Sequence, residues 1–158
     1  MLTEEAEQAM KGHAEKGYPH EVCGLLLGVL EESGKTRRIR ETHPARNLNQ
    51  DRPGDRYELD PSDFLRIERE ALMRRLEVMG VYHSHPDHPS IPSETDRARA
   101  EEIWQEAESW SYVILEVAAG RMASWRSWVL RGRAFAEEKA GVEAGGAREP
   151  GSGPCPSS

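Results

Sequence analysis

The chain has 158 residues, of which 37% are hydrophobic and 31% charged, and its formal net charge is −7 at pH 7. This length suits one domain with a single core, and no apolar run approaches the roughly 18 residues that a membrane span requires. The negative net charge also argues against binding to a phosphate backbone, because proteins that do so need a basic face. We therefore expect one domain that binds neither nucleic acid nor membrane, while its oligomeric state stays open.

Cysteine content and the first residues bear on the compartment. The two cysteines, Cys23 and Cys155, are too few for a disulfide framework. Residues 1–5 are mostly acidic and polar, whereas a secretory signal begins with a basic stretch followed by an apolar one. Both observations favour a cytoplasmic protein.

The first part of the chain predicts one helix and two strands. Thr3 is a suitable cap for a helix over residues 4–16, and Gly17 would end that helix. Residues 22–30 form a continuous apolar run with two glycines inside, which is typical of a buried strand rather than a helix. A second strand is expected over residues 36–42.

The middle of the chain predicts a loop, a helix and a strand. The polar stretch 44–57 has no clear period and is expected to be a loop. Asp60 and Pro61 then start a second helix, because an acidic cap followed by proline is typical of a helix N-terminus. This helix is expected to end near Leu76, and a strand over residues 78–85 follows it.

The last elements are a helix and a pair of strands. The third helix is expected to start at Ser93 and to run to about residue 108. Strands over residues 112–118 and 122–130 are joined by a turn that contains Gly120.

Composition and element order define the domain organisation. From Gly141 onward Gly, Ala, Pro and Ser dominate, so we expect a disordered tail over residues 141–158. Residues 1–140 contain a helix, two strands, a helix, a strand, a helix and two strands. This order predicts an α/β domain built around one mixed sheet.

Two histidines are the first feature that composition does not explain. His83 and His85 lie two residues apart on a predicted strand, so their side chains point to the same side and could hold one metal ion. The alternative is a pair of surface histidines at a strand end, which is the common meaning of an isolated His-x-His. The pair needs further ligands to indicate a metal site.

A serine and an aspartate lie at the start of the third predicted helix. Ser93 and Asp96 have the spacing of a capping box, in which the serine caps the helix and the acid lies in its first turn. In a metal site, Asp96 would supply a third ligand and the Ser93 hydroxyl would face a substrate carbonyl. The two roles are compatible because they use different atoms.

Glu21 stands at the entrance of the first apolar strand, where a solvated strand-end residue is the simple alternative. Three protein ligands leave one tetrahedral position for water, and hydrolysis then needs a base that takes the proton of this water. A carboxylate beside a buried strand suits that role. Cys23 lies two residues further on, on the same side of the strand. It could be a packed core residue, or else a spare zinc ligand or a redox switch.

Three separated segments carry a resemblance to a known family. They read HEVCGLLLG from residue 20, GVYHSHP from residue 80 and PSETD from residue 92. These segments resemble the JAMM signature of the MPN domain family, in which a glutamate precedes His-x-His-Pro, about seven residues and Ser-x-x-Asp. The resemblance covers roughly residues 1–138, and all five polar positions of the signature match.

The resemblance implies an MPN domain, a cytidine-deaminase-like α/β fold with a mixed, curved sheet flanked by helices. It also implies a zinc-dependent peptidase or isopeptidase. The implied ligands of Zn²⁺ are His83, His85 and Asp96. Glu21 would deprotonate a bound water and return the proton to the leaving amine, while Ser93 would stabilise the oxyanion.

The implied substrate depends on the subfamily. Eukaryotic members that cleave ubiquitin chains carry two insertions, and only the first has a modest counterpart here, over residues 44–57. The chain therefore resembles the compact prokaryotic members, which cleave after the terminal Gly-Gly of ubiquitin-like sulfur carriers. Two alternatives stay open: a non-catalytic scaffold that binds a ubiquitin-like partner, and a zinc hydrolase of small peptides.

Overall fold

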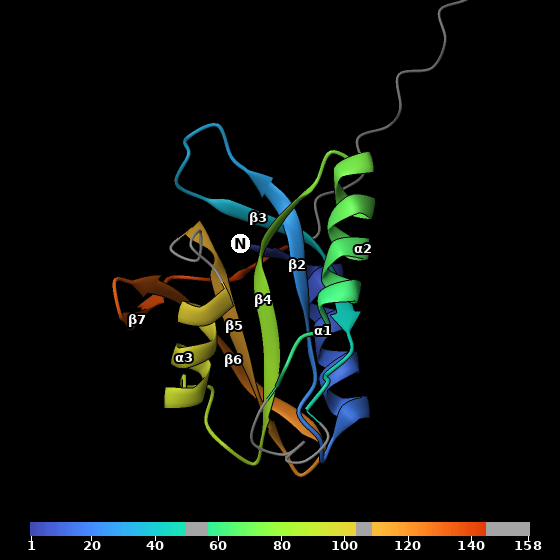
Figure 1. Cartoon of the computed structure of the whole chain (residues 1–158), viewed down its shortest axis with the longest axis vertical. Helices are drawn as coiled ribbons and strands as arrows, with labels where there is room; N and C mark the ends of the chain where they lie inside the picture. The colour runs from blue at the N-terminus through green and yellow to red at the C-terminus, as the bar shows by residue number, and fades with distance from the viewer. Residues whose placement is uncertain (50–56, 104–108, 145–158) are drawn as a thin grey trace, which may run out of the picture.

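The computed structural model describes residues 1–49, 57–103 and 109–144. The fold is built on one mixed sheet of eight strands, which curls strongly and has the order β7-β6-β5-β4-β2-β3-β1-β8 (Figure 1). Helices pack on both faces of this sheet. The arrangement confirms the expected α/β domain with a mixed, curved sheet flanked by helices.

The strands follow the predicted order, with three additions. Their bounds are β1 (Leu2–Thr3), β2 (Cys23–Leu30), β3 (Arg37–Ala45), β4 (Glu77–Pro86), β5 (Ser111–Ala118), β6 (Arg121–Arg131), β7 (Ala134–Glu138) and β8 (Val142–Glu143). Strands β1, β7 and β8 were not predicted as strands. They are two to five residues long, too short for a reliable alternation of apolar and polar residues.

The helices are α1 (Glu4–Gly17), α2 (Pro61–Met73) and α3 (Glu94–Ile103). Two of the predicted caps are present. The Thr3 hydroxyl accepts a hydrogen bond from the N–H of Ala6, and the Asp60 carboxylate accepts one from the N–H of Ser62. Side-chain caps of this kind satisfy N–H groups that have no partner inside the helix.

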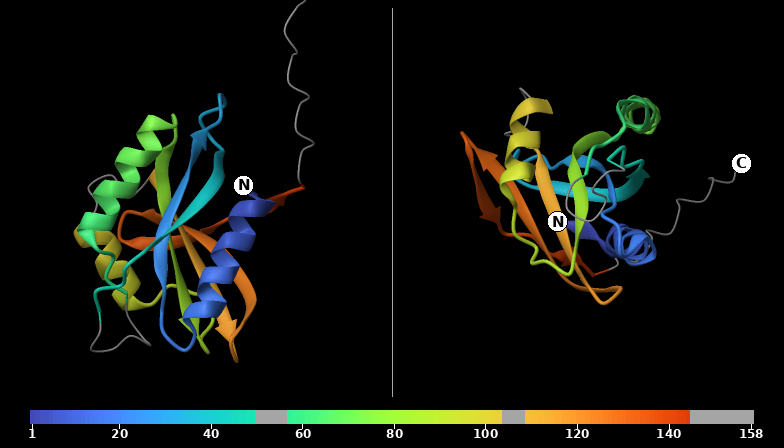
Figure 2. Two further views of the ribbon diagram at one scale, coloured as in Figure 1. Left: turned by 90° about the vertical axis from the view of Figure 1, so that its right-hand side faces the viewer. Right: turned by 60° about the horizontal axis from the view of Figure 1, so that its bottom comes forward.

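The continuous apolar run of β2 is explained by helices on both faces of the sheet. Leu26 packs in the core cluster that contains α1, whereas Leu25 and Leu27 pack in the cluster that contains α2 and α3. In Figure 2, α1 lies on one side of the sheet and the other two helices lie on the opposite side. A strand covered on both faces does not alternate between apolar and polar residues.

Strand β4 lies in the middle of the sheet and carries the two histidines. It pairs antiparallel with β2 and parallel with β5. A parallel pair needs a crossover connection, and α3 lies in the connection between β4 and β5. This connection runs from the C-terminal end of β4 to the N-terminal end of β5, so α3 begins near the C-terminal end of β4.

Helix α2 ends three residues earlier than predicted. Arg75 has a φ of 58°, and the N–H of Leu76 donates to the carbonyl of Ala71 at 2.9 Å while that of Arg75 donates to Leu72 at 3.1 Å. These bonds form a Schellman motif, which usually uses glycine at the left-handed position. Leu76 is only 5% exposed, so its apolar side chain belongs to the core beyond the helix.

Strand β3 includes Pro44 and Ala45, which the sequence had assigned to a loop. Pro44 pairs with Gly24 of β2 on one side. On the other side β1 pairs with β3 only at Ile39, so Pro44 lies on an edge where no N–H donor is needed.

Parts of three predictions lie outside the described residues: the centre of the loop 44–57, the end of the third helix and the tail beyond residue 144. Within the described part, Val142 and Glu143 form β8 and pair with β1. The disorder expected from Gly141 onward is therefore not found at these positions. None of the described helices is long and apolar enough to cross a membrane.

Candidate metal centre

The two histidines are placed by the register of β4 on β2. His83 pairs with Cys23, and Ser84 makes two hydrogen bonds with Val22. The Ser84 N–H donates to the Val22 carbonyl at 3.0 Å, and the Ser84 hydroxyl accepts from the Val22 N–H at 3.0 Å. Because residues two apart share a face of a strand, His83 and His85 point to the same side of the sheet.

The start of α3 has the predicted capping box. One carboxylate oxygen of Asp96, Oδ2, accepts hydrogen bonds from the backbone N–H and the hydroxyl of Ser93, both at 2.7 Å. In return the N–H of Asp96 donates to the Ser93 hydroxyl at 3.1 Å. These reciprocal bonds fix the orientation of the Asp96 carboxylate.

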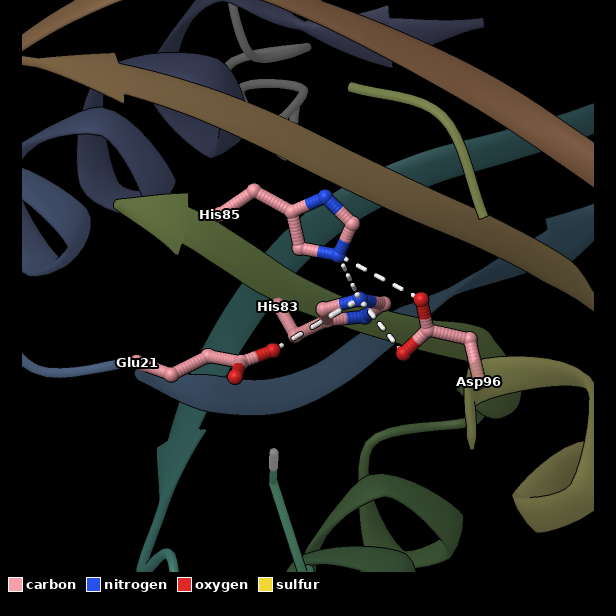
Figure 3. Close-up of side chains that lie close together, drawn as sticks. All are labelled: Glu21, His83, His85 and Asp96. Atoms are coloured by element: carbon pink, nitrogen blue, oxygen red, sulfur yellow. Dashed lines mark hydrogen bonds and ion pairs between the residues drawn. The ribbon is translucent and has the colours of Figure 1, made fainter. Parts of the chain in front are cut away.

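Four side chains from three parts of the chain converge on one point (Figure 3). The possible ligand atoms of Glu21, His83, His85 and Asp96 all lie within 4.8 Å of one another. Asp96 is the closest acid, with Oδ1 at 3.1 Å from Nε2 of His83 and Oδ2 at 3.3 Å from Nε2 of His85. Glu21 lies slightly farther away, with Oε1 at 3.8 Å from Nε2 of His83.

The donor set fits a divalent ion such as Zn²⁺. Imidazole nitrogens and carboxylate oxygens are its usual ligands, and metal–ligand bonds of about 2.0 Å in a tetrahedron separate the ligand atoms by about 3.3 Å. The Nε2 atoms of His83 and His85 are 3.0 Å apart, close to this spacing. The structure therefore brings together the three predicted ligands and Glu21 in an arrangement that suits one metal ion.

The tautomer of His85 also suits metal binding. Its Nδ1 lies 2.8 Å from the carbonyl oxygen of Pro89. A carbonyl only accepts hydrogen bonds, so in the neutral imidazole this contact places the proton on Nδ1 and leaves Nε2 available as a ligand. His83 differs, because its Nδ1 is buried and has no hydrogen-bond partner among the described residues.

Burial and neighbouring charges shift the pKa values of two residues of the cluster, Asp96 and His85. Burial by itself would raise the pKa of Asp96, but the two imidazoles and the N–H of Ser93 outweigh it and hold this pKa well below its usual range. Burial likewise opposes the charged form of His85. Its contacts with Asp96 and with the Pro89 carbonyl outweigh burial and raise its pKa. The low pKa favours the ionised form of Asp96, which is the form that can bind a metal ion.

Two residues next to the cluster were not predicted from the sequence. The ring of Tyr57 stacks on that of His83, with centroids 4.4 Å apart and planes 25° apart. The side-chain amide of Asn47 donates to the backbone carbonyl of Glu21 at 3.1 Å. The one sequence signal was that Tyr57 is the single aromatic residue of the polar stretch 44–57.

Cys23 takes the packing role rather than a place among the possible ligands. It is fully buried, and its Sγ faces the backbone carbonyls of Ala45 and Arg46, each at 3.8 Å. Burial raises the pKa of its thiol to about 12, which disfavours the thiolate that metals bind. The cluster of possible ligands does not include it among the described residues.

The sequence of this chain matches a known family over most of its length. Residues 3–131 match the family described as prokaryotic homologs of the JAB domain. The chain belongs to this family. A desampylase from Haloferax volcanii is 34% identical over 148 residues, which cover 90% of this chain and 95% of that protein. A CysO-cysteine peptidase from Mycobacterium bovis is 30% identical over 135 residues, or 85% of this chain and 84% of that protein.

A solved structure shows the same fold. It is a JAB1/MPN domain protein from Archaeoglobus fulgidus, with a TM-score of 0.54 and 16% sequence identity, and the match covers 90% of this chain and 95% of that chain. These findings confirm that this prokaryotic JAB domain has the predicted MPN fold. The family and its relatives also confirm the expected class of enzyme, a JAMM-type peptidase or isopeptidase.

Proposed function

We propose that this JAB domain is a zinc-dependent peptidase or isopeptidase that hydrolyses the bond after the C-terminal Gly-Gly of a ubiquitin-like or sulfur-carrier protein. The observation that carries the proposal is the convergence of Glu21 with His83, His85 and Asp96 in one largely buried cluster. The substrate class is supported by two relatives named desampylase and CysO-cysteine peptidase, which match over most of their lengths. The low cysteine content favours the cytoplasm as the compartment.

In this proposal His83, His85 and Asp96 are the metal ligands. When bound, the zinc ion would polarise the scissile carbonyl and lower the pKa of a water molecule. The protein prepares the ligands for it: the Pro89 carbonyl holds the tautomer of His85, and Ser93 holds the Asp96 carboxylate. Such contacts behind the ligands typically strengthen metal binding.

Glu21 is the proposed general base. It would take a proton from the attacking water and deliver that proton to the leaving amine. Its carboxylate is buried and lies beside the three proposed ligands, with Oε1 at 3.8 Å from Nε2 of His83. A structural zinc site with three ligands does not need a second acid at this distance, so Glu21 favours catalysis over a scaffold role.

Ser93 is the proposed contact to the oxyanion that forms from the scissile carbonyl. Its hydroxyl donates its single proton to Asp96 at 2.7 Å in this structure. Donation to a substrate oxygen therefore requires that the hydroxyl turns away from Asp96. The remaining bond from the N–H of Ser93 to Asp96 would still hold the carboxylate during that rotation.

The direct test uses a ubiquitin-like carrier protein whose C-terminal Gly-Gly is joined to a lysine side chain, and a second conjugate in which it is joined to a single cysteine. We expect the zinc-loaded protein to release the intact carrier from at least one conjugate. A chelator should abolish release, and added zinc should restore it. A matched conjugate with Ala-Ala in place of Gly-Gly should be cleaved poorly.

Three outcomes would contradict the proposal. Release that continues in the presence of the chelator would exclude the metal mechanism. Tight binding of both conjugates without release would identify a scaffold. Cleavage of short peptides alone, with neither conjugate affected, would identify a hydrolase of small peptides.

A further inference from the structure

One aromatic ring is in direct contact with a proposed metal ligand. Tyr57 stacks on His83 with a centroid distance of 4.4 Å and an interplanar angle of 25°, which is a stacked geometry. The two side chains are 6% and 1% exposed, so the contact is shielded from solvent. Stacked rings of this kind contribute orientation as well as buried area.

The two histidines of the cluster are held by different means. His85 is oriented through its second ring nitrogen, which donates to the Pro89 carbonyl. Metal-binding histidines usually have such a hydrogen bond. His83 has none among the described residues, because its Nδ1 is buried without a partner. Its ring plane must therefore be fixed by packing, and the face of that ring is covered by Tyr57.

Tyr57 is itself held in place by the neck of its loop, which we define as residues 46–49 and 57–60. Asn47 forms an antiparallel bridge with Leu59, and its side-chain oxygen accepts from the N–H of Glu58 at 2.8 Å. The N–H of Leu48 donates to the carbonyl of Glu58 at 2.7 Å. These bonds fix the backbone directly next to Tyr57.

We propose that Tyr57 is a positioning residue of the metal centre, which holds His83 by stacking in place of the hydrogen bond that His85 receives. The inference rests on the proposed function, because it assigns His83 as a ligand. The ring of Tyr57 rather than its hydroxyl performs this role. A residue expected to be part of a polar loop thus belongs to the metal centre.

The test compares Tyr57→Phe, which keeps the ring, with Tyr57→Leu, which removes it. Zinc affinity is measured by competition with a chromophoric chelator. We expect Tyr57→Leu to weaken zinc binding by about tenfold or more, the usual effect of losing a contact behind a metal ligand. Tyr57→Phe should stay within about threefold of the parent protein. Tyr57→Met is a second ringless variant in case Tyr57→Leu does not fold.

A readout without metal separates this inference from the proposed function. In the metal-free protein, NMR should find the ring protons of His83 shifted upfield by the aromatic ring in the parent and in Tyr57→Phe, and not in Tyr57→Leu. If the parent failed to bind zinc while these shifts were present, the proposed function would fail and the stacking would stand.

The control is Trp125→Leu, which removes a partly buried aromatic ring that packs against the core cluster on the opposite face of the sheet. It should lower stability and leave zinc affinity unchanged. The proposal is overturned if Tyr57→Leu binds zinc as tightly as the parent, if Tyr57→Phe loses as much affinity as Tyr57→Leu, or if Trp125→Leu weakens binding equally.

Discussion

Ser84 and Val22 are joined by two hydrogen bonds, one from the Ser84 N–H to the Val22 carbonyl and one from the Val22 N–H to the Ser84 hydroxyl, each 3.0 Å long. Ser84 stands between His83 and His85, and Val22 directly follows Glu21. The pair therefore ties the proposed base to the two proposed histidine ligands. Ser84 points to the face opposite the histidines, so it acts on the site through the backbone.

The Ser84→Ala substitution should destabilise the protein. Ser84 is fully buried, and the change leaves the N–H of Val22 without its acceptor. A lost partner of this kind costs about 1–3 kcal/mol. Urea unfolding of the metal-free protein should show that decrease in the free energy of unfolding, while Ser33→Ala in the exposed hairpin should show almost none. Equal stability of both variants would rule out the role of this bond.

Zinc should stabilise the folded protein through the histidines. At a free zinc concentration of about 100 times Kd, binding adds about 2.7 kcal/mol, or a rise in Tm of about 5–10 °C for a chain of this size. Calorimetry should find this rise in the parent and in His88→Ala, since His88 is exposed and outside the cluster. His85→Ala should lose most of it. A similar rise in all three proteins would contradict the assigned ligands.

Asn47 should affect catalysis through Glu21. Its amide donates to the Glu21 carbonyl, whereas its oxygen accepts from the backbone of the loop neck. Asn47→Asp keeps the acceptor and removes the donor. Without this donor the proposed base Glu21 is held less precisely, so we expect kcat to fall by about tenfold. This is less than the whole contribution of a general base, which is about 100-fold or more. Zinc affinity should be unchanged. Steady-state kinetics on a cleavable conjugate check this, with Asn49→Asp as the control for added charge. A change in zinc affinity without a change in kcat would contradict this role.

Cys23 should behave as an inert core residue. Burial raises the pKa of its thiol to about 12, so the reactive thiolate is scarce over the whole range from pH 6 to pH 9. In a Cys155→Ser background, a thiol reagent should label Cys23 in urea and leave it almost unlabelled in the folded protein. Rapid labelling of the folded protein near pH 8 would instead support a redox or metal role.

Much of the fold could be predicted because the main signals are local. The caps at Thr3 and Asp60 and the apolar run of β2 each depend on neighbouring residues alone. The end of α2 could not be predicted, because Arg75 takes a left-handed conformation that sequence patterns reserve for glycine. Strand β8 depends on its pairing with β1, and these two strands lie at opposite ends of the sequence of the domain.

The candidate site also has residues that local sequence patterns predict and residues that only the folded structure reveals. His83 and His85 are linked by strand spacing, Ser93 and Asp96 by helix capping, and the resemblance connected both pairs with Glu21. The structure brings these residues together. Tyr57 and Asn47 could not be predicted as neighbours of the site, because their contacts arise only when the loop neck packs against β2 and β4.

If Glu21 is the base at a metal held by His83, His85 and Asp96, Glu21→Gln should bind zinc normally and lose most of its kcat. The amide keeps the shape of the carboxylate and cannot take a proton. We expect zinc binding within about threefold of the parent and a fall in kcat of at least about 100-fold on a Gly-Gly conjugate. An exposed control, Glu5→Gln, should keep full activity. Cleavage by Glu21→Gln at the parent rate, with zinc bound, would exclude Glu21 as the base.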